Sequence, residues 1–172
     1  GILSDVYMCD ATPGVWLAHY WRRSCVREED DGSIGGIVPQ QVEACPDVFM
    51  GAGQEYVKQG VDGYDYIKEL MDNCGYQRVK SARELARAEA PNDRLLYLKQ
   101  GYTLTYDIDR QNDPQSKEPT LAELTAKAIE VLSRDPDGFM LMVEGGGIDW
   151  MAHNKDVAGV ARGVLAFDDA VA

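Results

Sequence analysis

The chain has 172 residues, of which 45% are hydrophobic, and 29 acidic and 17 basic residues give it a formal net charge of -12. This length is sufficient for one sizeable core, and the composition is typical of globular proteins. The acidic balance argues against a general nucleic-acid or anionic-membrane binder, because both need a basic face, and no apolar run approaches the roughly 20 residues that span a bilayer.

The first third of the chain is predicted to begin with a strand and a helix. Residues 2–9 favour a strand. Thr12 followed by Pro13 is typical of a helix start with Thr12 as the N-cap, and we expect this helix to run toward Arg22. Residues 27–36 are acidic and glycine-rich, which predicts a surface loop.

The middle of the chain alternates strand and helix signals. Residues 46–50 favour a strand that ends in the Gly-Ala-Gly of residues 51–53. We interpret these glycines as a tight turn; a nucleotide-binding loop is the weaker alternative, because the helix pattern that follows is poor. Residues 66–73 predict a helix that stops at Cys74-Gly75.

Two capping-box sequences predict helices further along, Ser-Ala-Arg-Glu at residues 81–84 and Thr-Leu-Ala-Glu at residues 120–123. Between them, residues 94–98 favour a strand. Residues 107–119, rich in Asp, Gln, Asn and Pro, predict an irregular connection.

The last part of the chain contains the clearest unit. Residues 138–143 predict a short buried strand, and valines recurring from Val157 to Val171 predict a helix. This helix reaches Ala172 without a stop signal, and residues 1–5 lack the features of a signal peptide. We therefore expect residues 1–172 to be one partial domain of α/β class, with a layered sheet.

The most informative segment is Val-Glu-Gly-Gly-Gly-Ile-Asp-Trp-Met-Ala-His at residues 143–153. It follows the predicted strand, and α/β sheets bind ligands at the carboxyl ends of their strands. Unpaired charges are costly to bury, so acids in such a place usually meet a cation. Asp149 and His153 are four residues apart and could share a metal, zinc being the best match, whereas Glu144 suits Mg²⁺. The alternative for Asp149 and His153 is an ordinary helix start with a solvated histidine.

Residues near the first strand extend this interpretation. Asp10 and Thr12 offer oxygen ligands, although Asp-x-Thr alone usually forms a helix cap. Arg22 and Arg23 are either ordinary surface charges or include one guanidinium that binds a phosphate through paired hydrogen bonds.

The number of histidines limits what the chain can do by itself. It contains two, His19 and His153, whereas a catalytic zinc usually has three protein ligands. No activated nucleophile is evident near the motif. The four cysteines have no C-x-x-C spacing, and both disulfides and buried thiols remain open for them.

These residues together resemble the alkaline phosphatase family. Residues 143–153 are similar to its V-E-G-x-x-I-D-x-x-x-H signature, and residues 10–13, with Ala18-His19 and Arg23, are similar to its D/H-A-T-P…A-H…R segment. Three shorter stretches, at residues 106–110, 119–125 and 165–171, also resemble the family. The similarity covers nearly the whole chain and is loosest over residues 56–100.

The resemblance implies a role for each matching residue. Asp149 and His153 correspond to two ligands of the first Zn²⁺. Glu144 and Thr12 correspond to Mg²⁺ ligands, and Asp10 to a residue that reaches Mg²⁺ through water.

Two further positions concern the substrate. Arg23 corresponds to the arginine that binds the substrate phosphate, and Trp150 to a variable position near it. The family hydrolyses phosphate monoesters through a phosphoserine intermediate, with two zinc ions and one magnesium ion, and its product is inorganic phosphate. It implies a three-layer α/β/α sandwich with a mostly parallel central sheet, a homodimer, and a periplasmic or secreted location.

Departures from the family pattern also matter. The Asp-Ser-Ala nucleophile segment is absent, since Ser4 lacks that context, and so are the later Asp-His pair and the final zinc histidine. We therefore expect a central fragment that is inactive by itself. The alternatives are a related phosphodiesterase or phosphotransferase, and a non-catalytic metal- or phosphate-binding module.

Overall fold

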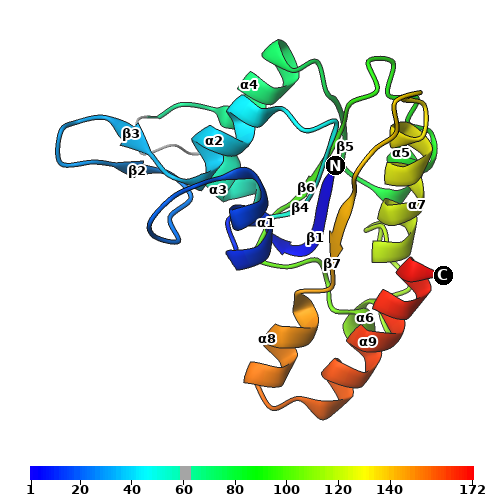
Figure 1. Cartoon of the computed structure of the whole chain (residues 1–172). Helices are drawn as coiled ribbons and strands as arrows, with labels where there is room; N and C mark the ends of the chain where they lie inside the picture. Colours follow the sequence, from blue (N-terminus) through cyan, green and yellow to red (C-terminus); the bar gives the residue numbers. More distant parts are fainter. Residues whose placement is uncertain (59–62) are drawn as a thin grey trace.

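The computed structural model describes residues 1–58 and 63–172. Its central element is a five-stranded sheet in the order β5-β6-β4-β1-β7, in which every pairing is parallel. The carboxyl ends of the strands therefore lie along one edge, at the bottom of Figure 1. The strands are β1 (Ile2–Tyr7), β4 (Val48–Ala52), β5 (Gln77–Val79), β6 (Leu95–Lys99) and β7 (Met142–Glu144).

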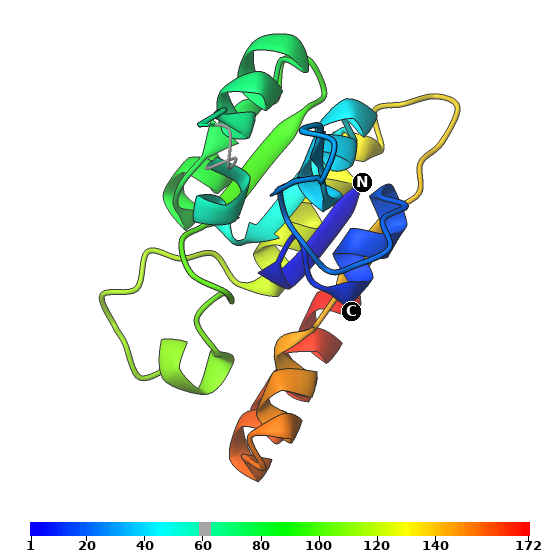
Figure 2. The same ribbon diagram turned by 90° about the vertical axis from the view of Figure 1, so that its left-hand side faces the viewer.

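Helices cover both faces of the sheet, which confirms the predicted α/β/α layering (Figure 1). One face carries α1 (Ala11–Leu17), α2 (Ile37–Ala44), α3 (Gln54–Lys58) and α4 (Tyr66–Asn73). The other carries α5 (Ala82–Ala86), α7 (Leu121–Leu132) and part of α9 (Val157–Val171). Both ribbon views show α8 (Gly147–His153) and the start of α9 projecting as a hairpin beyond the carboxyl edge (Figures 1 and 2).

Neighbouring residues of the central strands supply two separate cores. In β1, Ile2 packs toward the α2 and α4 side and Leu3 toward α7. Phe49 and Met50 divide in the same way in β4. Because both faces are covered, these strands have nearly continuous apolar sequences, as parallel strands usually do.

Helix α1 differs from its prediction at both ends. Its N-cap is Asp10 and not Thr12, because the Asp10 carboxylate accepts a hydrogen bond from the backbone N–H of Ala11 at 2.8 Å. The helix ends at Leu17, and Ala18 is already extended. The residues leading to Arg22 are therefore a connection and not part of the helix.

Two short strands lie within the loop predicted at residues 27–36. Strands β2 (Arg27–Glu28) and β3 (Ile34–Gly35) pair as an antiparallel hairpin. Helix α2 follows at once and was not predicted, because its N-cap Gly36 has no side chain with which to mark the start. Gly51 and Ala52, predicted as part of a turn, belong to β4, so that only Gly53 turns away from the sheet.

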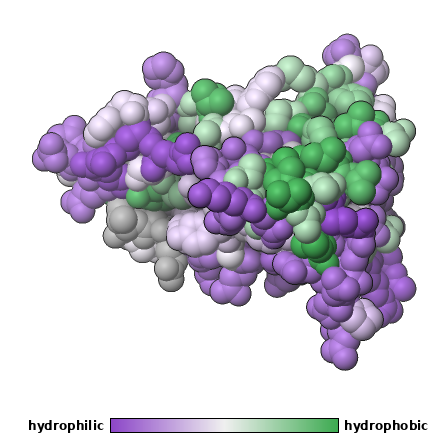
Figure 3. Space-filling model, turned by 90° about the horizontal axis from the view of Figure 1, so that it is seen from below, coloured by the Kyte–Doolittle hydropathy of each residue, from purple (hydrophilic) through white to green (hydrophobic). Residues whose placement is uncertain are grey.

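The strand that precedes the acidic motif is shorter and more exposed than predicted. It comprises Met142–Glu144 instead of residues 138–143, and all three residues are half-buried. The reason is its place in the sheet, since β7 pairs with β1 alone and forms an edge. Phe139 and Met140 are exposed, as are Val164 and Leu165 of α9. Seen from the carboxyl edge of the sheet, hydrophobic residues gather on the half of the molecule that carries α8 and α9, whereas the half that carries the β2–β3 hairpin is mostly hydrophilic (Figure 3).

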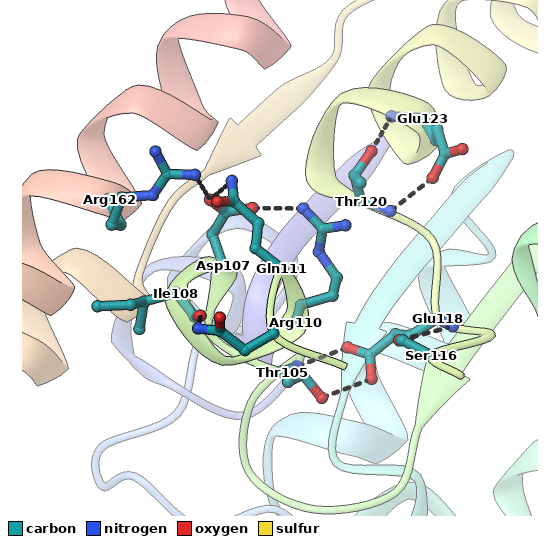
Figure 4. A network of polar contacts seen from close by, with 11 residues as sticks. Thr105, Asp107, Ile108, Arg110, Gln111, Ser116, Glu118, Thr120, Glu123 and Arg162 are labelled. Carbon is teal, nitrogen blue, oxygen red and sulfur yellow. Dashed lines mark hydrogen bonds and ion pairs between the residues drawn. The ribbon is translucent and has the colours of Figure 1, made fainter. Parts of the chain in front are cut away.

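The connection between β6 and α7 was predicted as irregular, but it contains one helical turn, α6 (Asp107–Arg110). Asp107 accepts hydrogen bonds from Arg110, from Gln111 at 2.8 Å and from Arg162 of α9 at 3.2 Å (Figure 4). These contacts fix the connection against the α8–α9 hairpin.

The remaining helix predictions are confirmed. Helices α4 and α9 have the expected extents, and α7 begins at the predicted capping box. Within the described residues, no helix has the length and apolar character needed to cross a membrane.

Candidate functional site

A cavity of about 590 Å³ opens at the carboxyl edge of β1 and β7. Its lining brings together every residue that was predicted for the site. These residues, which come from three separate segments of the chain, are Asp10, Thr12, Arg23, Glu144, Asp149, Trp150 and His153.

Asp10 is the central acceptor of this cavity. Arg23 donates to its Oδ1 at 2.8 Å, and the indole Nε1 of Trp150 donates to its Oδ2 at 3.0 Å. The Asp10 side chain is nearly buried, whereas the Arg23 side chain remains 57% exposed. The carboxylate therefore holds the arginine at the cavity while leaving guanidinium N–H groups available for an oxyanion.

A disulfide between Cys9 and Cys25 fixes this arrangement, with 5.3 Å between the two Cα atoms. One cysteine directly precedes Asp10 and the other lies two residues after Arg23. The second bridge joins Cys45 to Cys74. The open question about the cysteines is thus answered in favour of disulfides.

Glu144 lies at the end of β7 beside β1. Ser4 donates a hydrogen bond to its Oε2 at 2.6 Å, which orients the carboxylate. The next residues must be small, because a Cβ added at Gly146 would lie 2.9 Å from both γ-carbons of Val6 and 3.3 Å from Cδ of Glu144. The glycines of the motif therefore let the chain leave the strand while staying close to β1.

Asp149 and His153 lie one turn apart on α8, as their spacing predicted. Asp149 Oδ2 and His153 Nε2 are 3.5 Å apart, and both side chains are largely exposed, at 72% and 80%. They are thus on one side of the helix and accessible to an ion. The alternative from the sequence, a helix start with a solvated histidine, agrees equally well with this geometry.

The ligand atoms of these residues are of the types that the predicted ions prefer, but there are too few of them for a complete zinc site. Thr12 and Glu144 present hard oxygen atoms, which Mg²⁺ prefers while it keeps several waters. Asp149 and His153 supply one oxygen and one nitrogen, a pair suited to zinc, which usually requires a third protein ligand. The described residues contain no group of three or more His, Cys, Asp or Glu side chains arranged to hold a metal.

Two features next to the cavity were not predicted. Asp5 is half-buried beneath the glycine segment, where the backbone N–H of Gly147 donates to it at 2.9 Å. Tyr7 ends β1 and hydrogen-bonds Arg23, while burial is the main cause that raises the pKa of its hydroxyl. Both residues lie within the predicted first strand, and no motif in the sequence distinguishes them from its other residues.

Comparisons with known proteins agree with this geometry. The family model described as "Alkaline phosphatase" matches residues 1–172. The chain is 30% identical to alkaline phosphatase H of Pseudomonas aeruginosa, over 99% of this chain and 43% of the relative. It is also 30% identical to streptomycin-6-phosphate phosphatase of Streptomyces griseus, over 100% of this chain and 46% of the relative.

A solved structure shows the same relationship in three dimensions. The crystal structure of Thermus thermophilus alkaline phosphatase aligns with a TM-score of 0.83 and 28% identity, over 99% of this chain and 34% of that chain. The chain therefore spans less than half the length of these relatives.

Proposed function

The chain belongs to the alkaline phosphatase family, and from this premise we propose that the protein that carries it is a metal-dependent phosphate monoester hydrolase. The observation that carries the proposal is the single cavity lined by all seven predicted residues, which come from three segments of the chain. The substrates are phosphate monoesters and the product is inorganic phosphate.

In this proposal, Arg23 binds the phosphate. Its guanidinium is charged, exposed to the cavity and oriented by Asp10, and such a group can form paired hydrogen bonds with phosphate oxygens. Trp150 lines the same cavity. Its indole N–H donates to Asp10, the carboxylate that also accepts from Arg23, so that the indole lies beside the proposed phosphate site. We assign Trp150 to substrate contact.

The metal ligands divide into two sets. Glu144 and Thr12 would hold Mg²⁺, with Asp10 acting through water because both of its oxygens already accept hydrogen bonds. Asp149 and His153 would supply two ligands of one Zn²⁺. When bound, the zinc ions of such a site stabilise the attacking and leaving oxygens.

The nucleophilic serine of the phosphoserine intermediate is not Ser4. That side chain is fully buried, its hydroxyl donates to Glu144, and it does not line the cavity, so it is not accessible to a substrate. With two zinc ligands at the cavity and no serine among the described residues that line it, we propose that the isolated chain has no appreciable phosphatase activity.

The disulfides support a periplasmic or secreted location, because such bonds persist in oxidising compartments and are rare in the cytosol. A homodimer remains a prediction from the family, and sedimentation analysis of the whole protein tests it.

The function is tested by p-nitrophenyl phosphate hydrolysis in the presence of Zn²⁺ and Mg²⁺. In the whole protein we expect Arg23→Ala to lower kcat/KM about 10- to 100-fold, since a charge-assisted contact to the phosphate is lost. Arg22→Ala is the matched control, because Arg22 stacks over Trp21 and does not line the cavity. The pure 172-residue chain should show no turnover.

Three results would contradict the proposal. Equal effects of the two arginine variants would remove Arg23 from phosphate binding. Zinc-dependent turnover by the chain alone would show that its site is sufficient. Cooperative unfolding of the chain that Mg²⁺ shifts, together with an inactive whole protein, would favour a non-catalytic metal-binding module.

A further inference from the structure

Four aromatic rings meet beside the site cavity, and the proposed chemistry does not require three of them. Tyr7, Tyr56, Tyr102 and Trp150 have ring centroids 5.0 to 6.2 Å apart in five pairs. Tyr7 ends β1, Tyr56 lies in α3 shortly after β4, Tyr102 lies in the loop after β6, and Trp150 lies in α8. We call these four residues the aromatic cluster.

Backbone contacts between the strand ends hold the aromatic cluster in place. The N–H of Gly53 donates to the carbonyl of Gly101 at 2.8 Å, and the Glu55 carboxylate accepts from the N–H of Gly101 at 3.0 Å. Gly53 has φ +87°, and a Cβ added there would lie 2.7 Å from Cβ of Tyr7. The loops after β4 and β6 are therefore fixed against each other and against β1, which makes the cluster a built surface.

The cluster has an inner and an outer layer. Tyr7 and Tyr56 pack against the hydrophobic core on the α2 side, whereas Tyr102 and Trp150 belong to neither core. Tyr102 is 54% exposed, and its hydroxyl is hydrogen-bonded to that of Tyr56, which raises the pKa of Tyr56 to about 12. The outer rings thus pack against Tyr7 and Tyr56 on one side and are accessible to solvent on the other.

Trp150 joins this outer layer to the phosphate end of the site. Its ring centroid is 6.2 Å from that of Tyr102, while its Nε1 contacts Asp10, the partner of Arg23. Trp150 lines the cavity together with Arg23, and Tyr102 extends the aromatic surface beyond it, so that an ester whose phosphate is bound at Arg23 can place its organic group on the Trp150 side, toward Tyr102. Planar aromatic groups gain most from such a surface, because they stack on it face to face or edge to face.

We propose that Tyr102 and Trp150 form a binding surface for the aromatic organic group of a phosphate monoester, so that aryl and heteroaryl phosphates are the preferred substrate class. This inference rests on the proposed function. The surface contacts the organic group both before and during reaction, so it should lower KM and leave kcat nearly unchanged.

The test compares 1-naphthyl phosphate with glycerol 2-phosphate in the whole protein. Tyr102→Ala should raise KM for 1-naphthyl phosphate about 3- to 10-fold, the range expected for one aromatic contact, and leave KM for glycerol 2-phosphate unchanged. Tyr102→Phe keeps the ring and should retain the wild-type KM. Tyr64→Ala is the matched control, since Tyr64 is also a half-exposed tyrosine but its ring pairs with Tyr66 and not with the aromatic cluster.

The outcomes separate this inference from the proposed function. If the wild type hydrolyses both substrates and Tyr102→Ala affects them equally or not at all, the aromatic surface is wrong and the phosphatase stands. If the wild type hydrolyses neither substrate, the proposed function is wrong. Calorimetric binding of 1-naphthyl phosphate then decides the surface, because an affinity that Tyr102→Ala leaves unchanged overturns it.

Discussion

The carboxyl group of Asp5 is the least expected charge in the molecule at the scale of single residues. It lies in β1 beneath the glycine segment, and burial raises its pKa from 3.8 to about 6, with a smaller contribution from the nearby charge of Glu144. The folded protein therefore binds a proton that the unfolded chain releases between about pH 4 and pH 6. In this window stability falls as pH rises, and above it the full cost of about 3 kcal/mol applies.

Asp5→Asn should remove that cost, because the amide keeps an oxygen for the N–H of Gly147 and carries no charge. We expect the metal-free variant to be more stable than the wild type by about 2 to 3 kcal/mol at pH 7.5 and nearly equal at pH 4. Urea unfolding in EDTA across this range measures the difference. Asp30→Asn, at an exposed carboxylate, is the control, and a gain from Asp5→Asn that is equal at both pH values would contradict the burial argument.

At the scale of elements, helix α7 shows how a local sequence signal sets a boundary. Thr120 Oγ1 accepts from the N–H of Glu123 at 3.0 Å, and the Glu123 carboxylate accepts from the N–H of Thr120 at 2.8 Å (Figure 4). Thr120→Ala should cost about 1 kcal/mol of unfolding free energy because one helix-terminal N–H loses its partner. Thr120→Ser retains the hydroxyl and should be nearly neutral in the same denaturant titration. An equal loss in both variants would assign the effect to the threonine methyl group.

Elements with such local signals were predictable, and those defined by tertiary contacts were not. The helices α4, α7 and α9 have caps or periodic apolar faces within their own sequences. The edge position of β7 depends on which strand it pairs with, and α2 begins at a glycine without a side-chain cap. Short-range sequence patterns indicate neither which strands pair nor where a helix without a side-chain cap begins.

The same distinction applies to the site. The seven site residues that line the cavity could be predicted because they lie in two compact motifs, at residues 10–23 and 144–153. The aromatic cluster could not, because Tyr7, Tyr56 and Tyr102 become neighbours only through the strand order β6-β4-β1. Strand order is a property of the folded sheet and has no local signature here.

At the scale of the whole molecule, the two disulfides differ in their position relative to the site. The Cys9–Cys25 bridge closes a separation of 16 residues around the site and joins the segments that carry Asp10 and Arg23. The Cys45–Cys74 bridge closes 29 residues and joins the C-terminal caps of α2 and α4, away from the cavity. Loop-closure entropy gives each a stabilisation of about 3 to 4 kcal/mol, so stability alone cannot distinguish them.

Phosphate affinity should distinguish them. Replacing Cys9 and Cys25 by alanine removes the covalent restraint on the segment that carries Arg23. Binding of phosphate must then order this segment, and the conformational entropy that is lost weakens the affinity. We expect the inhibition constant of inorganic phosphate in the whole protein to rise several-fold in this variant. It should stay near the wild-type value when Cys45 and Cys74 are replaced, although both variants unfold at lower urea concentrations. Equal changes in phosphate inhibition would mean that the first bridge stabilises the fold without ordering the site, and Asp10 would then be sufficient to orient Arg23.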